Sequence, residues 1–129
     1  MLKIQKYKLS RRLVLLAGAL TLALPQLATA QSWPTKPIKL IIPFAAGGTT
    51  DILGRLLAQQ LTKDLGQNVI VENKGGAGGN IAAEFVAQAP ADGYTIMLAS
   101  GSMLTVNPSL YKKLPVNYSK DFVNITNVA

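Results

Sequence analysis

Residues 38–51 read IKLIIPFAAGGTTD, and this stretch decides the fold. Residues 38–42 are aliphatic except for Lys39 and are bounded by prolines, so they predict a strand whose nearly continuous apolar character suits burial on both faces. The loop that follows, residues 43–50, leads into apolar residues at helical spacing, which predict a helix over about residues 51–65. Thr49 or Thr50 is expected to cap its start, and Gly66 to end it. The spaced apolar residues are Ile52, Leu53, Leu56, Leu57, Leu61 and Leu65.

The same unit of strand, loop and helix recurs further along the chain. Residues 68–72 predict a second strand, the glycine-rich run 73–79 a second loop, and residues 80–89 a second helix. Asn80 is expected to cap that helix, and its buried face is expected to carry Ile81, Phe85 and Val86. Residues 94–99 predict a third strand, residues 109–113 one helical turn, and residues 121–129 the start of a fourth strand. This alternation predicts an α/β fold with a mostly parallel sheet that starts βαβαβ.

The loops after the strands are the place to look for function. Right-handed crossovers bring these loops to one edge of a parallel sheet, where ligands of open α/β sheets bind. Gly47 and Gly48 let backbone approach a ligand, and the free N–H groups at a helix start favour an anion. Thr49 and Thr50 add hydroxyl donors, and Asp51 complements the helix dipole. A plain tight turn with a threonine cap is the alternative interpretation.

A second glycine-rich loop on the same edge strengthens the binding interpretation. Residues 75–79 read GGAGG, which fits neither the dinucleotide pattern in register nor the lysine-containing phosphate loop. Ser100 and Ser102 follow the third strand, as hydrogen-bond donors to a ligand or as simple turn residues. The chain contains no histidine and no cysteine, which removes the usual base for a serine nucleophile and any thiolate chemistry. We therefore expect a binding protein without catalytic residues, metal or cofactor.

The first thirty residues have the three parts of a secretory signal. A basic start is followed by the apolar run 13–24 and by Ala28-Thr29-Ala30, so cleavage is expected before Gln31. The apolar run is about a dozen residues, short of the roughly 20 that span a bilayer, which disfavours a membrane anchor. Arg11-Arg12 resembles a twin-arginine signal, but the general secretory route is favoured.

The charge of the chain is concentrated in this leader. Five of the 13 basic residues and none of the 6 acidic residues lie in residues 1–30, so the net charge falls from +7 to +2 after cleavage. Residues 31–129 contain no basic stripe with interleaved aromatic residues. Nucleic-acid binding is therefore not expected.

Four stretches in order give a specific resemblance to the Bug family, the periplasmic solute-binding proteins of tripartite tricarboxylate transporters. They are Trp33-Pro34 with residues 41–51, VENKGGAGGNIA at residues 71–82, ADGYT at residues 91–95, and NPSLY at residues 107–111. The resemblance implies a two-lobed clamp (a Venus flytrap) that closes on a small organic acid in the periplasm. It also implies that the clamp hands this acid to the permease subunits of a membrane transporter.

The resemblance also implies which residues line the binding cleft. The loop from Phe44 to Asp51 meets the carboxylate in the family, and the loop 76–80 and the strand end 100–102 line the same cleft. The positions carried over are Phe44, Ala45, Gly47, Gly48, Thr49, Thr50, Asp51, Gly76, Ala77, Gly78, Asn80, Ser100, Gly101 and Ser102.

The match covers residues 31–129 but only about the first third of a family member. It implies that these residues are the N-terminal part of the first lobe and that the chain is truncated before the second lobe. Two alternatives stay open: a nonfunctional remnant, and a fragment of an exported α/β enzyme such as a hydrolase whose base lies elsewhere.

Overall fold

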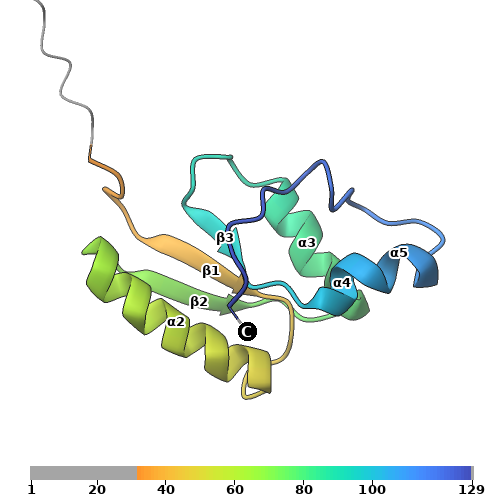
Figure 1. Ribbon diagram of the computed structural model, residues 1–129, viewed down its shortest axis with the longest axis horizontal. Helices are drawn as coiled ribbons and strands as arrows, with labels where there is room; N and C mark the ends of the chain where they lie inside the picture. Colours follow the sequence, from red (N-terminus) through yellow and green to blue (C-terminus); the bar gives the residue numbers. More distant parts are fainter. Residues whose placement is uncertain (1–31, 129) are drawn as a thin grey trace, which may run out of the picture. The chain divides into compact units, whose positions relative to one another are not determined.

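A computed structural model describes residues 32–128; the signal-peptide prediction for residues 1–30 lies outside them. Three strands alternate with helices along the chain (Figure 1). The elements are β1 (Ile38–Ile42), α2 (Thr49–Leu65), β2 (Val69–Asn73), the 3₁₀ turn η1 (Ala77–Gly79), α3 (Asn80–Ala87), β3 (Thr95–Met97), α4 (Gly101–Thr105) and α5 (Asn107–Leu110). The α/β fold with a βαβαβ start is therefore confirmed.

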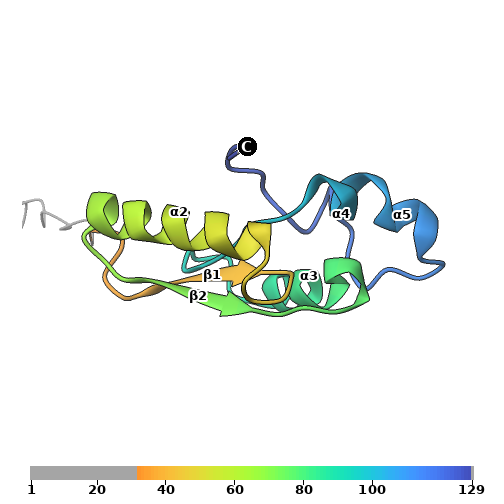
Figure 2. The same cartoon turned by 90° about the horizontal axis from the view of Figure 1, so that it is seen from below.

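The sheet is parallel throughout, with strand order β2-β1-β3. Ile38 pairs with Val69 on one side of β1, and Lys39 pairs with Thr95 on the other. Because the chain first steps from β1 to β2 and then back across β1 to β3, right-handed crossovers place the two connecting helices on opposite faces. Figure 2 shows α2 lying along one face of the strands.

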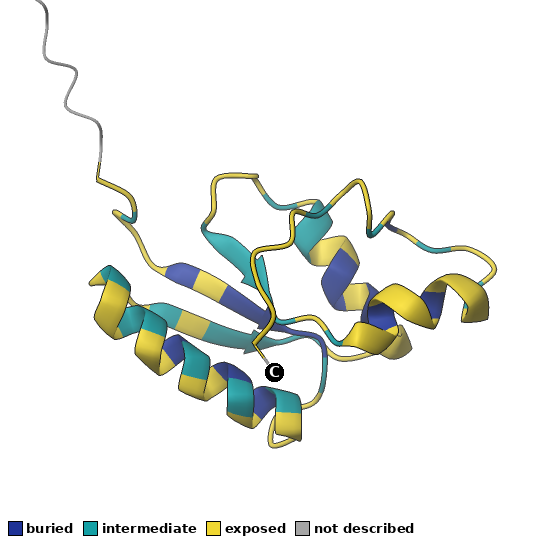
Figure 3. Cartoon of the chain, viewed as in Figure 1, coloured by how far each residue is buried: buried dark blue, intermediate teal, exposed yellow. Residues whose placement is uncertain are grey.

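Each face of the sheet carries its own apolar cluster. Leu40 and Ile42 of β1 pack with Ala58 of α2. On the other side, Ala83 of α3 packs with Met103 and Val116. Figure 3 places the buried positions along β1 and on the inward sides of α2, α3 and α4, so β1 is the centre of the fold. Its expected burial on both faces is confirmed except at Lys39, which is exposed.

The helix starts differ from the sequence prediction, whereas the end of α2 agrees with it. Gly48 precedes α2, so Thr49 and Thr50 are its first residues and not its caps. Gly79 precedes α3, so Asn80 lies inside the helix. Glycine at both positions leaves the first turns without a capping side chain. Gly66, in the left-handed conformation, ends α2 as expected.

The helices bury their small residues, which corrects the prediction of large apolar contacts. Ala82 and Ala83 face inward on α3, while Ile81 is 51% exposed and Phe85 36% exposed. In α2 the buried positions include Gly54, and a Cβ there would lie 2.5 Å from Cδ1 of Ile42. The helices lie so close to the sheet that small side chains fill the most buried positions, while the larger Leu57 packs half-buried against the cluster beside α2.

The last third of the described chain also departs from expectation. α4 was not predicted, and α5 begins at Asn107 because a proline is tolerated in the first turn of a helix. Residues 121–128 form no strand. Val116, Tyr118 and Phe122 instead cover the cluster beside α3. Within residues 32–128 no helix is both long enough and apolar enough to cross a bilayer.

Candidate functional site

The loops that follow the three strands meet at one edge of the sheet, called here the carboxyl edge (residues 43–50, 74–79 and 98–102). The N–H of Lys74 donates to the carbonyl of Ile42 at 2.8 Å, and that of Leu98 donates to the carbonyl of Ile41 at 3.1 Å. A Cβ on Gly75 would lie 3.6 Å from the backbone nitrogen of Ala45. The first two loops therefore approach each other closely, with little room for a side chain at position 75.

The carboxyl edge contains a switch in chain direction. After β1 the chain turns to α2 on one face, and after β3 it turns to α4, whose Met103 packs on the opposite face. In open α/β sheets the crevice between two such strands is where ligands bind. Here it lies between the first loop and residues 98–102.

The first turn of α2 presents backbone donors at this crevice. Gly48 has no side chain to cap the helix, and Thr49 beside it is exposed. Among residues 32–128 no hydrogen bond engages the N–H groups of Gly48, Thr49 or Thr50. Free N–H groups at the positive end of a 17-residue helix can bind an anion.

Gly48 is not required by the fold. Its φ of −77° and ψ of 169° are ordinary extended values, and an added Cβ would only touch the carbonyl of Ala45 at 3.5 Å. Its neighbour Gly47, by contrast, has a φ of +84°, which favours glycine. The missing side chain at position 48 therefore leaves the end of α2 open.

Asp51 lies beneath the first loop and is 3% exposed. Its carboxylate accepts hydrogen bonds from Gly47 N–H at 2.8 Å, Arg55 Nε at 3.0 Å and Asn73 Nδ2 at 2.9 Å. The Arg55 hydrogen bond, then those from Gly47 and Asn73, lower the pKa of Asp51 to about 2. The carboxylate is thus ionised at neutral pH, and it occupies the N–H of Gly47.

We expect Asp51 to make the stability of the fold depend on pH in the acid range. Its pKa is lower in the folded chain than the usual value near 3.9, so its contribution is complete above about pH 4 and is lost as the pH falls through about 2. Urea unfolding from pH 5 to pH 2 should show wild-type stability falling more steeply than that of Asp51→Asn. Parallel curves for the two proteins would contradict the lowered pKa.

The second loop is held by a buried amide, Asn80, which is 4% exposed. Its Oδ1 accepts hydrogen bonds from Asn107 Nδ2 and from the Tyr118 hydroxyl, both at 2.9 Å. Asn107 Nδ2 also donates to the carbonyl of Gly78 at 3.0 Å. The contacts made by Asn80 are therefore internal, and they join the loop to α5 and to the segment after it.

The third part of the edge carries two hydroxyls. Ser100 Oγ and Ser102 Oγ lie 3.0 Å apart at the start of α4, and Ser102 is exposed. Within residues 32–128 no group of three His, Cys, Asp or Glu side chains could hold a metal ion. This edge offers a ligand backbone N–H groups and hydroxyls, while the ammonium of Lys74 is paired with the carboxylate of Glu72 at 2.7 Å.

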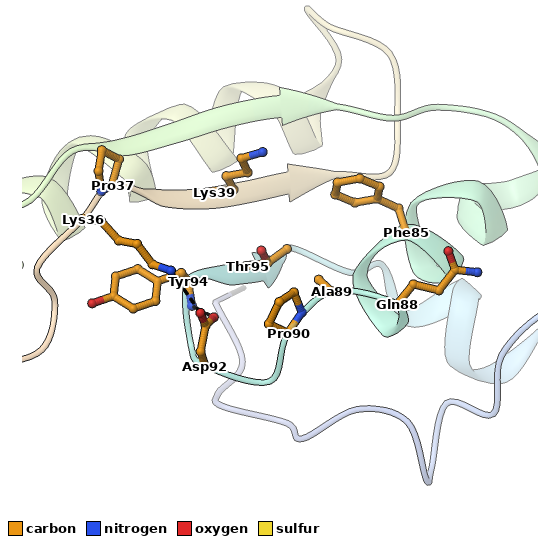
Figure 4. Close-up of a pocket in the computed structure, with 10 residues that line it drawn as sticks. All are labelled: Lys36, Pro37, Lys39, Phe85, Gln88, Ala89, Pro90, Asp92, Tyr94 and Thr95. Atoms are coloured by element: carbon orange, nitrogen blue, oxygen red, sulfur yellow. Dashed lines mark hydrogen bonds and ion pairs between the residues drawn. The ribbon is translucent and has the colours of Figure 1, made fainter.

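A surface hollow of about 490 Å³ lies along β1 and β3, beside the C-terminal end of α3 (Figure 4). Lys39 and Thr95 form part of its floor, and Phe85 lies at one end. At the opposite end Lys36 Nζ is 3.1 Å from the carboxylate of Asp92 and 4.3 Å from the centre of the Tyr94 ring. Lys36 is thus engaged by its neighbours. At the Phe85 end the hollow adjoins the carboxyl edge, because Lys74 Nζ lies 4.1 Å from the centre of the Phe85 ring.

A family of known proteins matches most of the described chain. The family described as the tripartite tricarboxylate transporter family receptor, TctC, matches residues 53–129. The chain belongs to the TctC family. The match begins inside α2, so the first loop lies just before it.

Individual relatives of this TctC chain include Bug proteins, as expected from the sequence. A UPF0065 protein of Bordetella bronchiseptica is 42% identical over 120 residues, covering 93% of this chain and 36% of that protein. Protein BugT of Bordetella pertussis is 43% identical over 101 residues, covering 78% and 31% respectively. The chain spans about a third of the length of these curated relatives.

Solved structures give the same picture of the fold. A periplasmic transporter shares 50% identity with a TM-score of 0.64, covering 66% of this chain and 29% of the other. A protein of R. palustris solved with adipate shares 40% identity with a TM-score of 0.65, covering 67% and 29%. A TctC solute-binding protein from Polaromonas, without ligand, shares 42% identity with a TM-score of 0.57, covering 64% and 29%. The chain thus shares the fold of about 29% of each of these periplasmic binding proteins.

In this TctC chain some of the predicted site residues are exposed, some are half-buried and two are buried. The exposed ones at the carboxyl edge are Ala45, Gly47, Gly48, Thr49, Gly76, Ala77, Gly78, Gly101 and Ser102. Phe44, Thr50 and Ser100 are half-buried, and Asp51 and Asn80 are buried. Sequence reasoning did not single out Asn73 and Asn107, whose amides hold the first and second loops. Asn73 and Asn107 both lie beside elements of the predicted site, and this proximity is the sequence feature that could have identified them.

Proposed function

We propose that this chain provides part of a periplasmic receptor site for a small organic acid. The observation that carries the proposal is the uncapped first turn of α2, which opens at the switch point of the sheet beside a second glycine-rich loop. A carboxylate there would accept hydrogen bonds from the N–H groups of Gly48, Thr49 and Thr50 and would complement the helix dipole.

Membership of the TctC family supports the class of ligand. The R. palustris neighbour was solved with adipate, a dicarboxylate, and that structure is 40% identical to this chain. Ser100 and Ser102 would supply further hydroxyl donors across the crevice, and Gly76, Ala77 and Gly78 would line its side. The function is binding and not catalysis, because backbone N–H groups and hydroxyls can hold an anion but supply neither a base nor a nucleophile activated by one.

The remaining parts of the proposal concern export and delivery. Residues 1–30 direct export and are removed, residues 31–129 form the N-terminal part of the first lobe, and the bound acid passes to membrane permease subunits. The leader sequence and the family description support these statements. A second lobe would complete the clamp, since enclosure between lobes buries more of a small ligand than one open edge can.

A side chain at position 48 is expected to block binding without unfolding the chain. Gly48→Val fits the extended backbone there but covers the N–H groups of the helix start, so we expect at least a roughly tenfold loss of affinity for adipate. Calorimetry with a panel of dicarboxylates measures the affinity, and circular dichroism checks the fold.

The graded control is Gly48→Ala, whose methyl group makes one ordinary contact and leaves more of the helix end open. It should lose less affinity than the valine variant. A folded Gly48→Val protein with wild-type affinity would show that the first loop is only a turn. A wild-type protein that binds no acid in the panel would refute the proposed function itself.

A further inference from the structure

Three side chains form a closed ring beneath the first loop. Asp51 Oδ2 accepts a hydrogen bond from Arg55 Nε at 3.0 Å, and Asp51 Oδ1 accepts one from Asn73 Nδ2 at 2.9 Å. Arg55 Nη2 closes the ring by donating to Asn73 Oδ1 at 3.3 Å. Each side chain thus contacts both others, and the ring joins the start of α2 to the end of β2.

The ring holds the first loop at two points. Asn73 Nδ2 donates to the carbonyl of Phe44 at 3.1 Å, and the N–H of Gly47 donates to Asp51 Oδ2 at 2.8 Å. The residues between these points, Ala45 and Ala46, are exposed. Since the described structure holds Ala45 and Ala46 mainly through these two anchors, the conformation of the loop depends on the ring.

The location of the carboxylate argues against direct contact with an acid. Asp51 is buried, carries a negative charge and already accepts three hydrogen bonds, so it has nothing to offer a second carboxylate. Arg55 compensates for this charge, with its Nε 3.0 Å from the same oxygen, Oδ2, that accepts the hydrogen bond from Gly47. A negative group can therefore lie under an anion site when it shapes that site and does not contact the ligand.

We propose that Asp51 and Asn73 are positioning residues, which hold residues 44–47 so that the N–H groups from Gly48 onward are open to a carboxylate. This inference rests on the proposed function for the site. It assigns a role to Asn73, and it replaces direct ligand contact by Asp51 with an action through the loop.

The test is a reciprocal exchange of the two side chains. Gly47 N–H and Asn73 Nδ2 donate to different oxygens of Asp51, and Asp51→Asn replaces one of these oxygens by an NH2 group that cannot accept. One of the two hydrogen bonds is therefore lost, and adipate affinity should fall by about tenfold. Asn73→Asp sets a second carboxylate against Asp51 and removes the donor to Phe44, with a loss of similar size. The double variant restores one amide and one carboxylate across the pair, so the anchor at Gly47 can form again while the donor to Phe44 stays absent. It should therefore recover part of the affinity and lose less than the sum of the two single losses.

The matched control is Asp64→Asn, the same change on the same helix. Asp64 accepts a hydrogen bond from Gln60 on the exposed side of α2, at 2.9 Å, so its replacement should leave adipate affinity unchanged. Losses in the double variant that equal the sum of the single losses would overturn the proposal, as would wild-type affinity in Asp51→Asn.

Hydrogen exchange without ligand separates this inference from the proposed function. The amide of Gly47 should be protected in the wild-type chain and in Asp64→Asn, and should exchange faster in Asp51→Asn. If no acid binds but this pattern is found, the ring exists and the proposed function fails. If acids bind but Gly47 is equally protected in all variants, the proposed function stands and the positioning role is wrong. If Asp51→Asn does not fold, Asn73→Ala, which removes the anchor at Phe44, tests the same point.

Discussion

Gly79→Ala is expected to destabilise the chain by about 2–4 kcal/mol, because backbone strain and a steric clash add together. Gly79 has a φ of +91°, in the left-handed region that side chains disfavour. An added Cβ would lie 2.7 Å from Sδ and 2.8 Å from Cε of Met103, which is fully buried. Met103 belongs to the apolar cluster beside α3, so the clash falls within the core.

Gly66→Ala is the matched control for the contribution of backbone strain alone. Gly66 has a φ of +65° at the end of α2, and nothing lies within 4 Å of the position its Cβ would take. Its replacement should therefore cost only the strain, about 1 kcal/mol. Denaturant unfolding of the two variants compares the costs, and equal losses would show that Met103 moves aside at no cost.

Asn80→Ala is expected to destabilise the chain by about 2–3 kcal/mol, because it removes the acceptor that two donors share. Asn107, which is 4% exposed, keeps only its hydrogen bond to Gly78, and the half-buried Tyr118 hydroxyl loses its acceptor. Asn80 joins the second loop to α5 and to the segment after it, so the change should also loosen residues 107–118.

A double-mutant cycle with Tyr118→Phe tests whether the network acts as described. The phenylalanine keeps the stacked contact with Phe122 and removes only the hydroxyl. The double variant should lose less stability than the sum of the two single losses. The reason is that Tyr118→Phe removes the hydroxyl donor that Asn80→Ala would leave unpaired. Additive losses in urea unfolding would indicate that Asn80 and Tyr118 contribute independently.

Local sequence patterns predicted the elements that depend on local rules. The strand at residues 38–42 was predicted with its observed bounds, and the strand at residues 69–73 was displaced by one residue, because aliphatic runs between turn signals need no tertiary information. The end of α2 at Gly66 follows from the left-handed conformation that glycine adopts. The helix after the third strand was missed, since five residues are too few to show a period.

The arrangement of the loops agrees with the sequence prediction, whereas their role in binding stays a prediction. The glycine-rich loops do meet at one edge, as the rule for parallel crossovers requires. The sequence could not say which polar residues turn inward. Asp51 and Thr50 are neighbours on one helix, yet one is buried under three donors and the other remains half-exposed.

The sequence by itself determined a parallel α/β sheet, two glycine-rich strand-to-helix turns and the resemblance to Bug proteins, because periodicity, turn chemistry and motif order are properties of neighbouring residues. Only the tertiary structure decided that Gly54, Ala82 and Ala83 face the sheet while Ile81 and Phe85 do not. It also decided that Asp51 and Asn80 bind other parts of the chain. The physical reason is that burial depends on how closely elements approach one another, and on which donors from distant residues reach the same oxygen atoms.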